Sequence, residues 1–492
     1  MTPLSEIIFG TSENKAAKRL RRLLKARKVR KIAPRLYTTN LDDLSAKVVQ
    51  DNIYEILGGL FPKAILSHRS ALEGKPTAKW EVFLTNSYSR TVLLPGLTVR
   101  LLKGPPAGAA DKPFMGDLFM ASQPRAFLEN CQRTRRGETS AKAVPRKELE
   151  ERLERILRLR GEKALNALRD DARRAAKELG FLSEFKMLDR IIGAMLKTSP
   201  ATGLKSSLAK ARAAGEAFDP ERLRLFETLF SALKKTPLRE TTEPHVRPEA
   251  LRVLAFFEAY FSNYIEGTRF EVDEAREIIF DGKIPGTRPK DAHDVLGTYR
   301  VVSNLARLRE LPLNESKLWA LLSTRHEAIL GGRPETKPGE VKADVNRAGD
   351  TVFVVPDLVR GTLAKGFEFY KVLDSPSAKA AFMMFLISEV HPFNDGNGRI
   401  ARVMMNAELV TAGLRRIIIP TVFRDDYLGA LRALSRRGDP AAYLRMIDHA
   451  QRFSASVDFS NFPSARRGLE ATNAFKDAGE AHLVMPETGK DE

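Results

Sequence analysis

Two apolar segments near the carboxyl terminus, separated by a short polar loop, restrict the fold more than any other feature. Residues 378–390 and residues 399–413 are mostly apolar, and the stretch that joins them reads HPFNDGNGR. Proline disfavours helix in the residue before it, so the first segment should end near His391. Both segments are long enough to be buried helices. We therefore expect two packed helices that are joined by a glycine-rich loop.

The loop has the composition of an anion-binding site. Glycines directly before a helix leave backbone N–H groups unpaired, and the helix dipole adds positive potential there. Arg399 and Arg402 are three residues apart on the first turn, where guanidinium groups can bind phosphate oxygens. Asp395 is a hard oxygen ligand suited to Mg²⁺, and His391 can accept a proton near neutral pH. An ordinary turn with a capping histidine does not explain this density of functional residues.

The string HPFNDGNGRIAR, residues 391–402, resembles the signature of the Fic (Fido) family without a gap. The resemblance covers residues 246–455 and implies an all-helical domain with a β-hairpin flap. It also implies transfer of AMP from ATP to a hydroxyl of a target protein, with release of pyrophosphate. In this scheme His391 is the base that activates the hydroxyl, and Asp395 holds Mg²⁺. The anion hole is formed by Gly396, Asn397 and Gly398. The outer phosphates are bound by Arg399 and Arg402.

Three further positions follow from the resemblance. Residues 337–357 contain two extended runs around Ala348-Gly349-Asp350, where the family has its flap, which would bind the target by strand addition. Tyr427 falls where the family often places a residue against the adenine, and packing in the core explains it equally well. A kinase-like relative has lysine at the position of Gly398, so the glycine argues against phosphate transfer.

A built-in inhibitor is predicted upstream. Residues 251–267 have the apolar spacing of a helix, and Ser262 and Glu266 share one face of it before Gly267 ends it. An ordinary amphipathic helix with a solvated glutamate is the alternative. The pattern Ser-x-x-x-Glu-Gly resembles the inhibitory motif of Fic proteins, which implies that Glu266 pairs with Arg402 and occupies the place of the γ-phosphate.

The amino-terminal region is strongly basic. The chain has 81 basic and 62 acidic residues, a net charge of +19, and ten of the seventeen residues 15–31 are basic. This segment is either a solvated helix face or a surface that contacts phosphates. Residues 29–40 read as a basic hairpin, and helices followed by such a hairpin are typical of a winged helix-turn-helix. We therefore expect a winged-helix domain over residues 1–55 that binds duplex DNA through residues 11–37.

Residues 56–135 are predicted to form a small α+β domain. Strands are expected at 80–85, 91–94 and 97–102, with a turn at Pro95-Gly96. The succession APRLYTTN, LFPKAILSHRSAL, VFLT and LLPGLTVRLLKG resembles the amino-terminal region of AbiEi-type antitoxins, which pair a winged helix with a small mixed domain. His68 in this region is interpreted as a structural or capping residue.

The fold class is accordingly multidomain and mainly α. A helical region with a linker is expected over residues 146–245, a Fic domain over 246–455, and a mobile tail over 456–492. The single cysteine, Cys131, excludes an internal disulfide and suits a reducing cytoplasm. The amino terminus lacks the pattern of a signal peptide, and no apolar run is long enough to cross a membrane.

Three functions remain open at this point. The first is a self-inhibited protein AMP-transferase that uses ATP and Mg²⁺. The second is an enzyme with the same pocket that removes AMP, with Glu266 aligning a water. The third is a transcriptional regulator in which the Fic domain senses a nucleotide. The sequence does not name the target protein, and it does not distinguish a monomer from a homo-oligomer.

Overall fold

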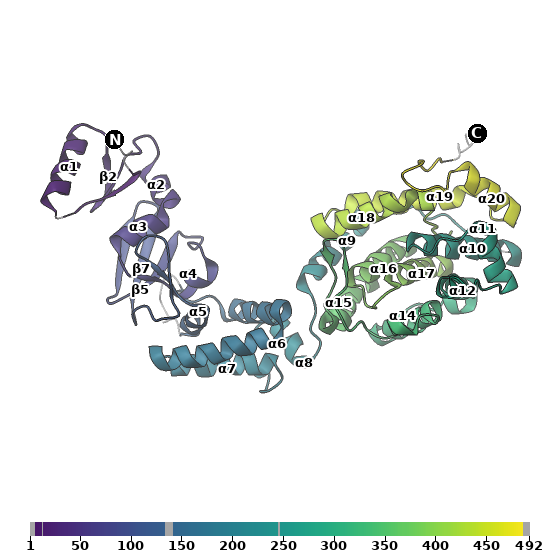
Figure 1. The fold of residues 1–492 in the computed structure, drawn as a ribbon, viewed down its shortest axis with the longest axis horizontal. Coiled ribbons are helices and arrows are strands. Elements are labelled where there is room, and N and C mark those ends of the chain that lie inside the picture. The colour runs from purple at the N-terminus through teal and green to yellow at the C-terminus, as the bar shows by residue number, and fades with distance from the viewer. Residues whose placement is uncertain (1–4, 12, 133–140, 245–246, 486–492) are drawn as a thin grey trace. The chain divides into compact units, whose positions relative to one another are not determined.

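A computed structural model describes residues 5–11, 13–132, 141–244 and 247–485. The chain divides after Gly215 into two units, residues 1–215 and residues 216–492. Figure 1 labels the helices and strands of both.

The basic amino-terminal segment forms one helix and a small sheet. In chain order the elements are β1 (Ile7–Phe9), α1 (Asn14–Lys25), β2 (Arg30–Ala33) and β3 (Leu36–Thr38). The three strands pair antiparallel in the order β1-β3-β2, so the expected hairpin is present as β2–β3. Within the described part of this segment α1 alone precedes the hairpin. The arrangement therefore differs from the expected winged helix-turn-helix, in which more than one helix comes before the wing.

A six-stranded mixed sheet follows, in the order β6-β7-β5-β4-β9-β8. The three expected strands correspond to β5, β6 and β7, and β6 and β7 pair antiparallel across the turn at Pro95-Gly96. The bounds of the elements in this part are α2 (Ser45–Asp51), α3 (Ile53–Leu60), β4 (Ile65–Leu66), α4 (His68–Glu73), β5 (Glu81–Asn86), β6 (Arg90–Leu94), β7 (Leu97–Lys103), β8 (Lys112–Pro113), β9 (Phe119–Met120) and α5 (Gln123–Asn130).

The expected domain boundary after residue 55 does not match this structure. Helix α3 spans the boundary, and one hydrophobic core joins Leu36 of β3 to Leu57 of α3 and Val99 of β7. All three side chains are fully buried. Burial of a shared apolar core makes the β1–β3 sheet and the larger sheet one packed body.

A helical segment completes the first unit, as expected for this part of the chain. It consists of α6 (Arg146–Leu179), α7 (Leu182–Met195) and α8 (Ser207–Ala214). These helices share a core with Phe127 and Leu128 of α5. Helix α6 is interrupted at Gly161, whose φ of +76° is not helical.

The boundary expected after residue 245 is also displaced. Helix α9 (Pro220–Lys235) belongs to the second unit, because its buried residue Phe226 makes edge contacts with Phe382 and Phe385. The helix begins at Pro220 and is capped by Asp219, which accepts from the N–H groups of the first turn.

The second unit is helical, and its strands among the described residues are the two of a short hairpin (Figure 1). Helices α16 and α17 lie side by side at its centre. The remaining bounds are α10 (Pro248–Ile265), α11 (Val272–Arg276), a π-helical turn (Glu277–Asp281), α12 (Pro289–Ser303), α13 (Leu305–Leu308), α14 (Glu315–Leu330), β10 (Arg347–Ala348), β11 (Thr351–Val352), α15 (Val359–Lys371), α16 (Pro376–Val390), α17 (Asn397–Thr411), α18 (Arg424–Arg437), α19 (Pro440–Ser456) and α20 (Phe462–Ala471), with 3-10 turns at Pro334–Thr336, Pro356–Leu358 and Thr421–Phe423.

The expected mobile tail is wrong for residues 456–485. Helix α20 lies in this stretch, and Phe459 and Leu469 are fully buried in a core that is shared with α10. Phe475 stacks on Phe261 of α10 with ring centroids 5.3 Å apart. The burial of these aromatic and aliphatic side chains offsets the cost of ordering the segment. Residues 486–492 lie outside the described part of the chain.

No helix in the described ranges is long and apolar enough to cross a membrane. Cys131 is buried, and burial raises the pKa of its thiol to about 12. It is therefore an inert core residue. A cytoplasmic location stays a prediction.

Candidate active site

The predicted pair of helices and their loop are present as α16, residues 391–396 and α17. Ser375 caps α16, its Oγ accepting from the N–H of Ala378 at 3.2 Å. The helix ends at His391, whose φ of +53° is left-handed, and Pro392 follows. Gly396, with φ of +71°, precedes the first turn of α17. The glycine therefore supplies a backbone conformation that other residues rarely adopt.

Side-chain hydrogen bonds fix the loop conformation. The Asn397 amide accepts from the N–H of Phe393 at 2.9 Å and donates to the carbonyl of the same residue at 2.9 Å. From outside the loop, Asn346 donates to the carbonyl of Phe393 at 2.8 Å. Asn397 was predicted as part of the anion hole, and in the structure its side chain closes the loop. Its backbone N–H remains at the start of α17.

His391 has the tautomer that a general base needs. Its Nδ1 lies 3.0 Å from the carbonyl oxygen of Ser388, so Nδ1 carries the proton and Nε2 is the basic atom. The imidazole stacks face to face on Phe353, with centroids 3.7 Å apart. Burial lowers the pKa of His391 to about 4, which keeps the ring neutral at physiological pH.

Asp395 presents a carboxylate at the surface of the loop. Its side chain is 50% exposed and its Oδ2 lies 3.8 Å from Nη2 of Arg399. The described residues contain no cluster of three or more His, Cys, Asp or Glu side chains that could hold a metal. One exposed carboxylate fits Mg²⁺ when substrate phosphates complete the coordination, and it does not fit an all-protein metal cage.

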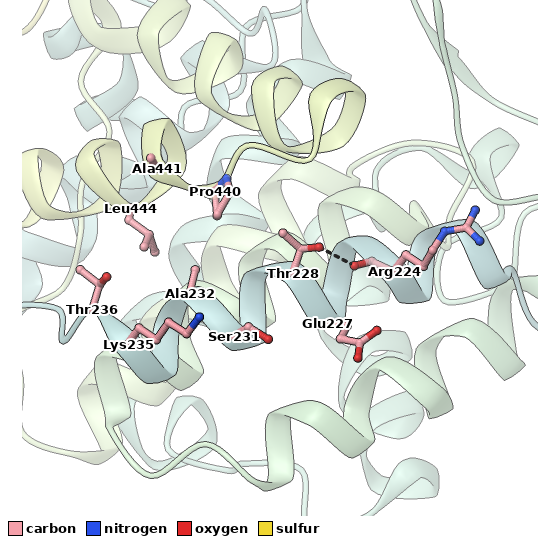
Figure 2. Close-up of a pocket in the computed structure, with 10 residues that line it drawn as sticks. All are labelled: Arg224, Glu227, Thr228, Ser231, Ala232, Lys235, Thr236, Pro440, Ala441 and Leu444. Carbon is pink, nitrogen blue, oxygen red and sulfur yellow. Dashed lines mark hydrogen bonds between the residues drawn. The ribbon is translucent and has the colours of Figure 1, made fainter.

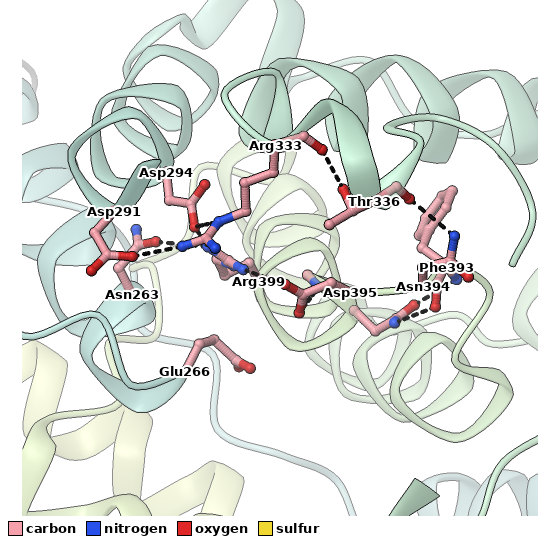
Figure 3. Close-up of polar contacts among 12 residues, drawn as sticks. Asn263, Glu266, Asp291, Asp294, Arg333, Thr336, Phe393, Asn394, Asp395 and Arg399 are labelled. Atoms are coloured by element: carbon pink, nitrogen blue, oxygen red, sulfur yellow. Dashed lines mark hydrogen bonds and ion pairs between the residues drawn. The ribbon is translucent and has the colours of Figure 1, made fainter. Parts of the chain in front are cut away.

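Arg399, which is predicted to bind the outer phosphates, is buried and paired with protein groups in this structure. It is 3% exposed, and its Nη1 donates to Asp294 at 2.6 Å and to Asn263 at 3.3 Å. Figure 3 shows Asp294 between Arg399 and Arg333, whose Nε donates to it at 2.8 Å. Asp294 is fully buried, and its two guanidinium partners compensate its charge there. In this structure the Arg399 side chain joins α17 to Asp294 of α12 and Asn263 of α10.

Arg402 is held by the predicted inhibitory helix, α10. Its Nη2 donates to Oε1 of Glu266 at 2.8 Å and to the Ser262 carbonyl at 2.8 Å, and its Nε donates to Ser262 Oγ at 3.1 Å. The arginine is 4% exposed. The Glu266 carboxylate also lies directly against Gly398, where a Cβ would collide with Oε1. The two distant motifs are therefore in direct contact.

Two other predicted residues complete this cluster. Gly267 has a φ of +96° and follows Glu266 at the end of α10, as the motif requires. Tyr427 is 1% exposed, and its hydroxyl accepts from Nη1 of Arg402 at 3.3 Å. Of the two roles considered for Tyr427, the structure favours packing in the core beside Arg402.

The predicted flap is a short hairpin, with β10 and β11 joined at Gly349-Asp350. Arg222 of α9 donates to the carbonyl of Val352, and Arg436 of α18 donates to Thr351 Oγ1 at 3.0 Å. The flap is therefore tied to two helices of the second unit.

A hollow of about 700 Å³ lies away from this loop, between α9 and α19 (Figure 2). Residues that line it include Arg224, Glu227, Lys235 and Leu444. None of the predicted site residues lines it. We assign it no part in the chemistry.

The model of the Fic/DOC family matches residues 318–409. A Fido domain-containing protein of Dictyostelium discoideum is 31% identical over 108 residues, which are 20% of this chain and 76% of that protein. This chain belongs to the Fic/DOC family. The matched residues run from α14 to α17 and include the flap and the glycine-rich loop. We call residues 391–398 the Fic loop.

Longer relatives carry the name of an activity. Protein adenylyltransferase fic-1 of Caenorhabditis briggsae is 26% identical over 213 residues, 42% of this chain and 41% of that protein. The chain thus spans about two fifths of the length of this curated relative. Among solved structures, Fic-1 from C. elegans is 19% identical with a TM-score of 0.37, and the match covers 66% of this chain and 92% of that chain.

Sequence reasoning missed four residues that hold the Fic loop. These are Asp294, which binds Arg399; His326, which binds the carbonyl of Asp395; Asn346, which binds that of Phe393; and Phe353, which stacks on His391. Each of these residues lies 38 to 105 positions away from its partner in the sequence and belongs to no recognisable motif. The one available signal was a buried position for a polar residue on a helix, as at His326.

Proposed function

We propose that this protein is a self-inhibited protein AMP-transferase, which moves AMP from ATP to a hydroxyl side chain of a target protein. Membership of the Fic family and the adenylyltransferase names of its longer relatives support the reaction class. The observation that carries the proposal is the contact of Glu266 with Arg402 and Gly398, at the start of the loop helix.

The proposed chemistry needs a base and a positioned triphosphate. Nε2 of His391 takes the proton of the target hydroxyl, whose oxygen forms a bond to the α-phosphorus of ATP. The bond between the α-phosphorus and the bridging oxygen breaks, and pyrophosphate leaves with that oxygen. Neutral His391, fixed by Ser388 and Phe353, has the lone pair for this step.

Backbone groups of the Fic loop would balance the charge of the phosphates. The N–H groups at the start of α17 are not used inside the helix, and the helix dipole places positive potential there. Asp395 would hold Mg²⁺, which supplies charge neutralisation on the phosphates when it is bound. Catalysis in this scheme consists of positioning and electrostatic stabilisation.

Glu266 is proposed to act as the inhibitor. Its carboxylate lies against Gly398 and forms a charge-assisted hydrogen bond with Arg402. A triphosphate that used Arg402 for its γ-phosphate would have to displace that carboxylate. A buried, paired guanidinium keeps its carboxylate partner more strongly than an exposed one. ATP would therefore bind in a nonproductive pose until α10 releases Glu266.

The amino-terminal unit is proposed to bind duplex DNA through residues 11–37. Support comes from exposed cations on α1, on the turn after it and on β2 that have no hydrogen-bond or ion-pair partner among the described residues: Lys15, Lys18, Arg19, Arg21, Arg22, Lys25, Arg27, Lys28 and Lys31. Unpaired cations on one helix and the hairpin beside it suit a phosphate backbone. The likeness to AbiEi-type antitoxins stays a prediction.

The enzyme proposal is tested with α-labelled and γ-labelled ATP. Incorporation of α-label into protein, and not γ-label, supports AMP transfer. If a pre-labelled target instead loses AMP faster with wild type than with Glu266→Gly, the main reaction is removal. If neither label moves while nucleotide binding alters DNA binding, the Fic domain is a sensor.

A further inference from the structure

One side chain of α14, His326, reaches the Fic loop from outside it. His326 is fully buried. Its Nε2 lies 2.9 Å from the carbonyl oxygen of Asp395, and its Nδ1 lies 2.9 Å from the backbone N–H of Gly339. A backbone N–H can only donate, so Nδ1 is the acceptor and Nε2–H is the donor to Asp395. The two contacts fix the tautomer of the ring.

The ring also packs against the loop. The Phe393 ring stacks on it with centroids 3.8 Å apart and planes within 10°. A Cβ at Gly396 would lie 3.3 Å from Nε2, so the imidazole fills the space beside that glycine. Nδ1 accepts the Gly339 N–H, which only a neutral imidazole can do. Both nitrogens of the His326 ring are therefore hydrogen-bonded, and one face of the ring is stacked on Phe393.

The same helix holds the segment that leads into the flap. Ser323, one turn before His326, donates to the carbonyl of Gly339 at 2.7 Å. Beyond Gly339 the chain returns to the Fic loop, where the N–H of Lys342 donates to the carbonyl of Pro392 at 3.0 Å. Helix α14 thus binds the base of the flap on one side and the main chain of Asp395 on the other.

We propose that His326 is a positioning residue that sets the place of Asp395 and of the adjacent N–H groups relative to the flap. It acts through the loop and touches neither the nucleotide nor the target. The inference rests on the proposed function only for its catalytic consequence, because the hydrogen bonds and stacking exist without substrate. Residues that orient a metal-binding side chain commonly change affinity or activity about tenfold to a hundredfold when they are replaced.

Two substitutions separate the two halves of the ring. In His326→Gln the side-chain amide nitrogen can occupy the position of Nε2 and donate to Asp395. In His326→Asn the amide oxygen can occupy the position of Nδ1 and accept from Gly339, and the donor to Asp395 is lost. Both remove the stacking on Phe393, so they share a packing loss. Trp319→Phe is the control, because Trp319 packs near Phe393 from the same helix.

The first readout does not depend on activity. Hydrogen–deuterium exchange of the full-length, nucleotide-free protein should show faster exchange at residues 393–398 in His326→Asn than in His326→Gln or Trp319→Phe. The second readout is AMP transfer in a Glu266→Gly background. There His326→Asn should lower kcat about tenfold or more and raise the Mg²⁺ concentration for half-maximal rate, and His326→Gln should recover much of both.

The outcomes separate this inference from the proposed function. Faster exchange of residues 393–398 in His326→Asn alone, with no AMP transfer by any variant, would support the positioning role and refute the enzyme proposal. Equal exchange and equal kinetics for the Asn and Gln variants would overturn the positioning role, because the residue would then only fill space. Unchanged exchange in both would overturn it as well.

Discussion

Asp294 should be among the most costly residues to replace in the second unit. It is fully buried and accepts from Nη1 of Arg399 at 2.6 Å and from Nε of Arg333 at 2.8 Å (Figure 3). Arg333 is 22% exposed and also binds Asp291, so it keeps a partner and water when Asp294 is removed. Arg399 is 3% exposed and, among the described residues, would keep Asn263 and the carboxylate of Asp395, which is 3.8 Å away. The main loss is therefore an uncompensated buried charge.

The size of that loss follows from buried pairs in general. Removing one partner costs about 3–5 kcal/mol, whereas removing both charges costs much less. Asp294→Ala should therefore lower the free energy of unfolding by about 3–5 kcal/mol. The double variant with Arg399→Met should recover a part of this, with an interaction energy on the order of 1–3 kcal/mol.

The assay is denaturant unfolding of the ligand-free protein, monitored on the transition of the helical second unit. Asp291→Ala is the matched control, because the Asp291 carboxylate is 32% exposed and pairs with the same Arg333. It should cost about 1 kcal/mol or less. If Asp294→Ala costs no more than Asp291→Ala, or if the double variant loses the sum of the two single losses, Arg399 is not held by Asp294 as described.

Four other results are expected. His391→Ala should reduce α-label transfer by about 10²–10⁴-fold, and retention of most activity would exclude His391 as the base. Burial lowers the pKa of His391 to about 4, whereas the histidine of the unfolded chain has a pKa of about 6.5. The unfolded chain therefore binds a proton first, and the free energy of unfolding should fall as the pH drops from about 6.5 to about 4. A His391→Phe variant should lose less stability over the same pH range. Reversing the charges of Arg21, Arg22 and Lys25 should weaken duplex DNA binding strongly, and wild-type affinity should fall steeply with salt in a filter or anisotropy titration; a folded protein that ignores DNA at low salt would contradict this. Leu469→Ala should lower the free energy of unfolding by about 2–5 kcal/mol, because Leu469 of α20 is fully buried in the core. An unchanged unfolding midpoint would show that α20 is not packed there.

Local patterns made part of this structure predictable. The Fic loop is a continuous string: the proline after His391 predicts that α16 ends there, and a glycine stands at position 396, where the backbone is left-handed. The partner of Arg402 was predicted from the resemblance of Ser-x-x-x-Glu-Gly to the inhibitory motif of Fic proteins, and the structure has Ser262 and Glu266 in contact with Arg402.

Long-range packing explains what the sequence did not predict. Two expected domain boundaries were displaced because α3 and α9 bury apolar faces against elements far away in the chain, as Phe226 does against Phe382. Phe459 and Phe475 lack helical periodicity, so their packing on α10 was not visible. The pairing of Arg399 with Asp294 was not visible, because the two residues are 105 positions apart in the chain. The role of Arg399 at the phosphates stays a prediction.

The most direct test of the central claim is the rate of α-label transfer by Glu266→Gly, compared with wild type, Arg402→Ala and the double variant. Loss of the Glu266–Arg402 pair, worth about 1.5–3 kcal/mol, should raise the rate on the order of tenfold to a hundredfold. Arg402→Ala should not imitate this activation, and the double variant should be no faster than Arg402→Ala, since the triphosphate needs that guanidinium. A Glu266→Gly protein that is folded and no faster than wild type would show that α10 is an ordinary core helix and that the enzyme is not self-inhibited.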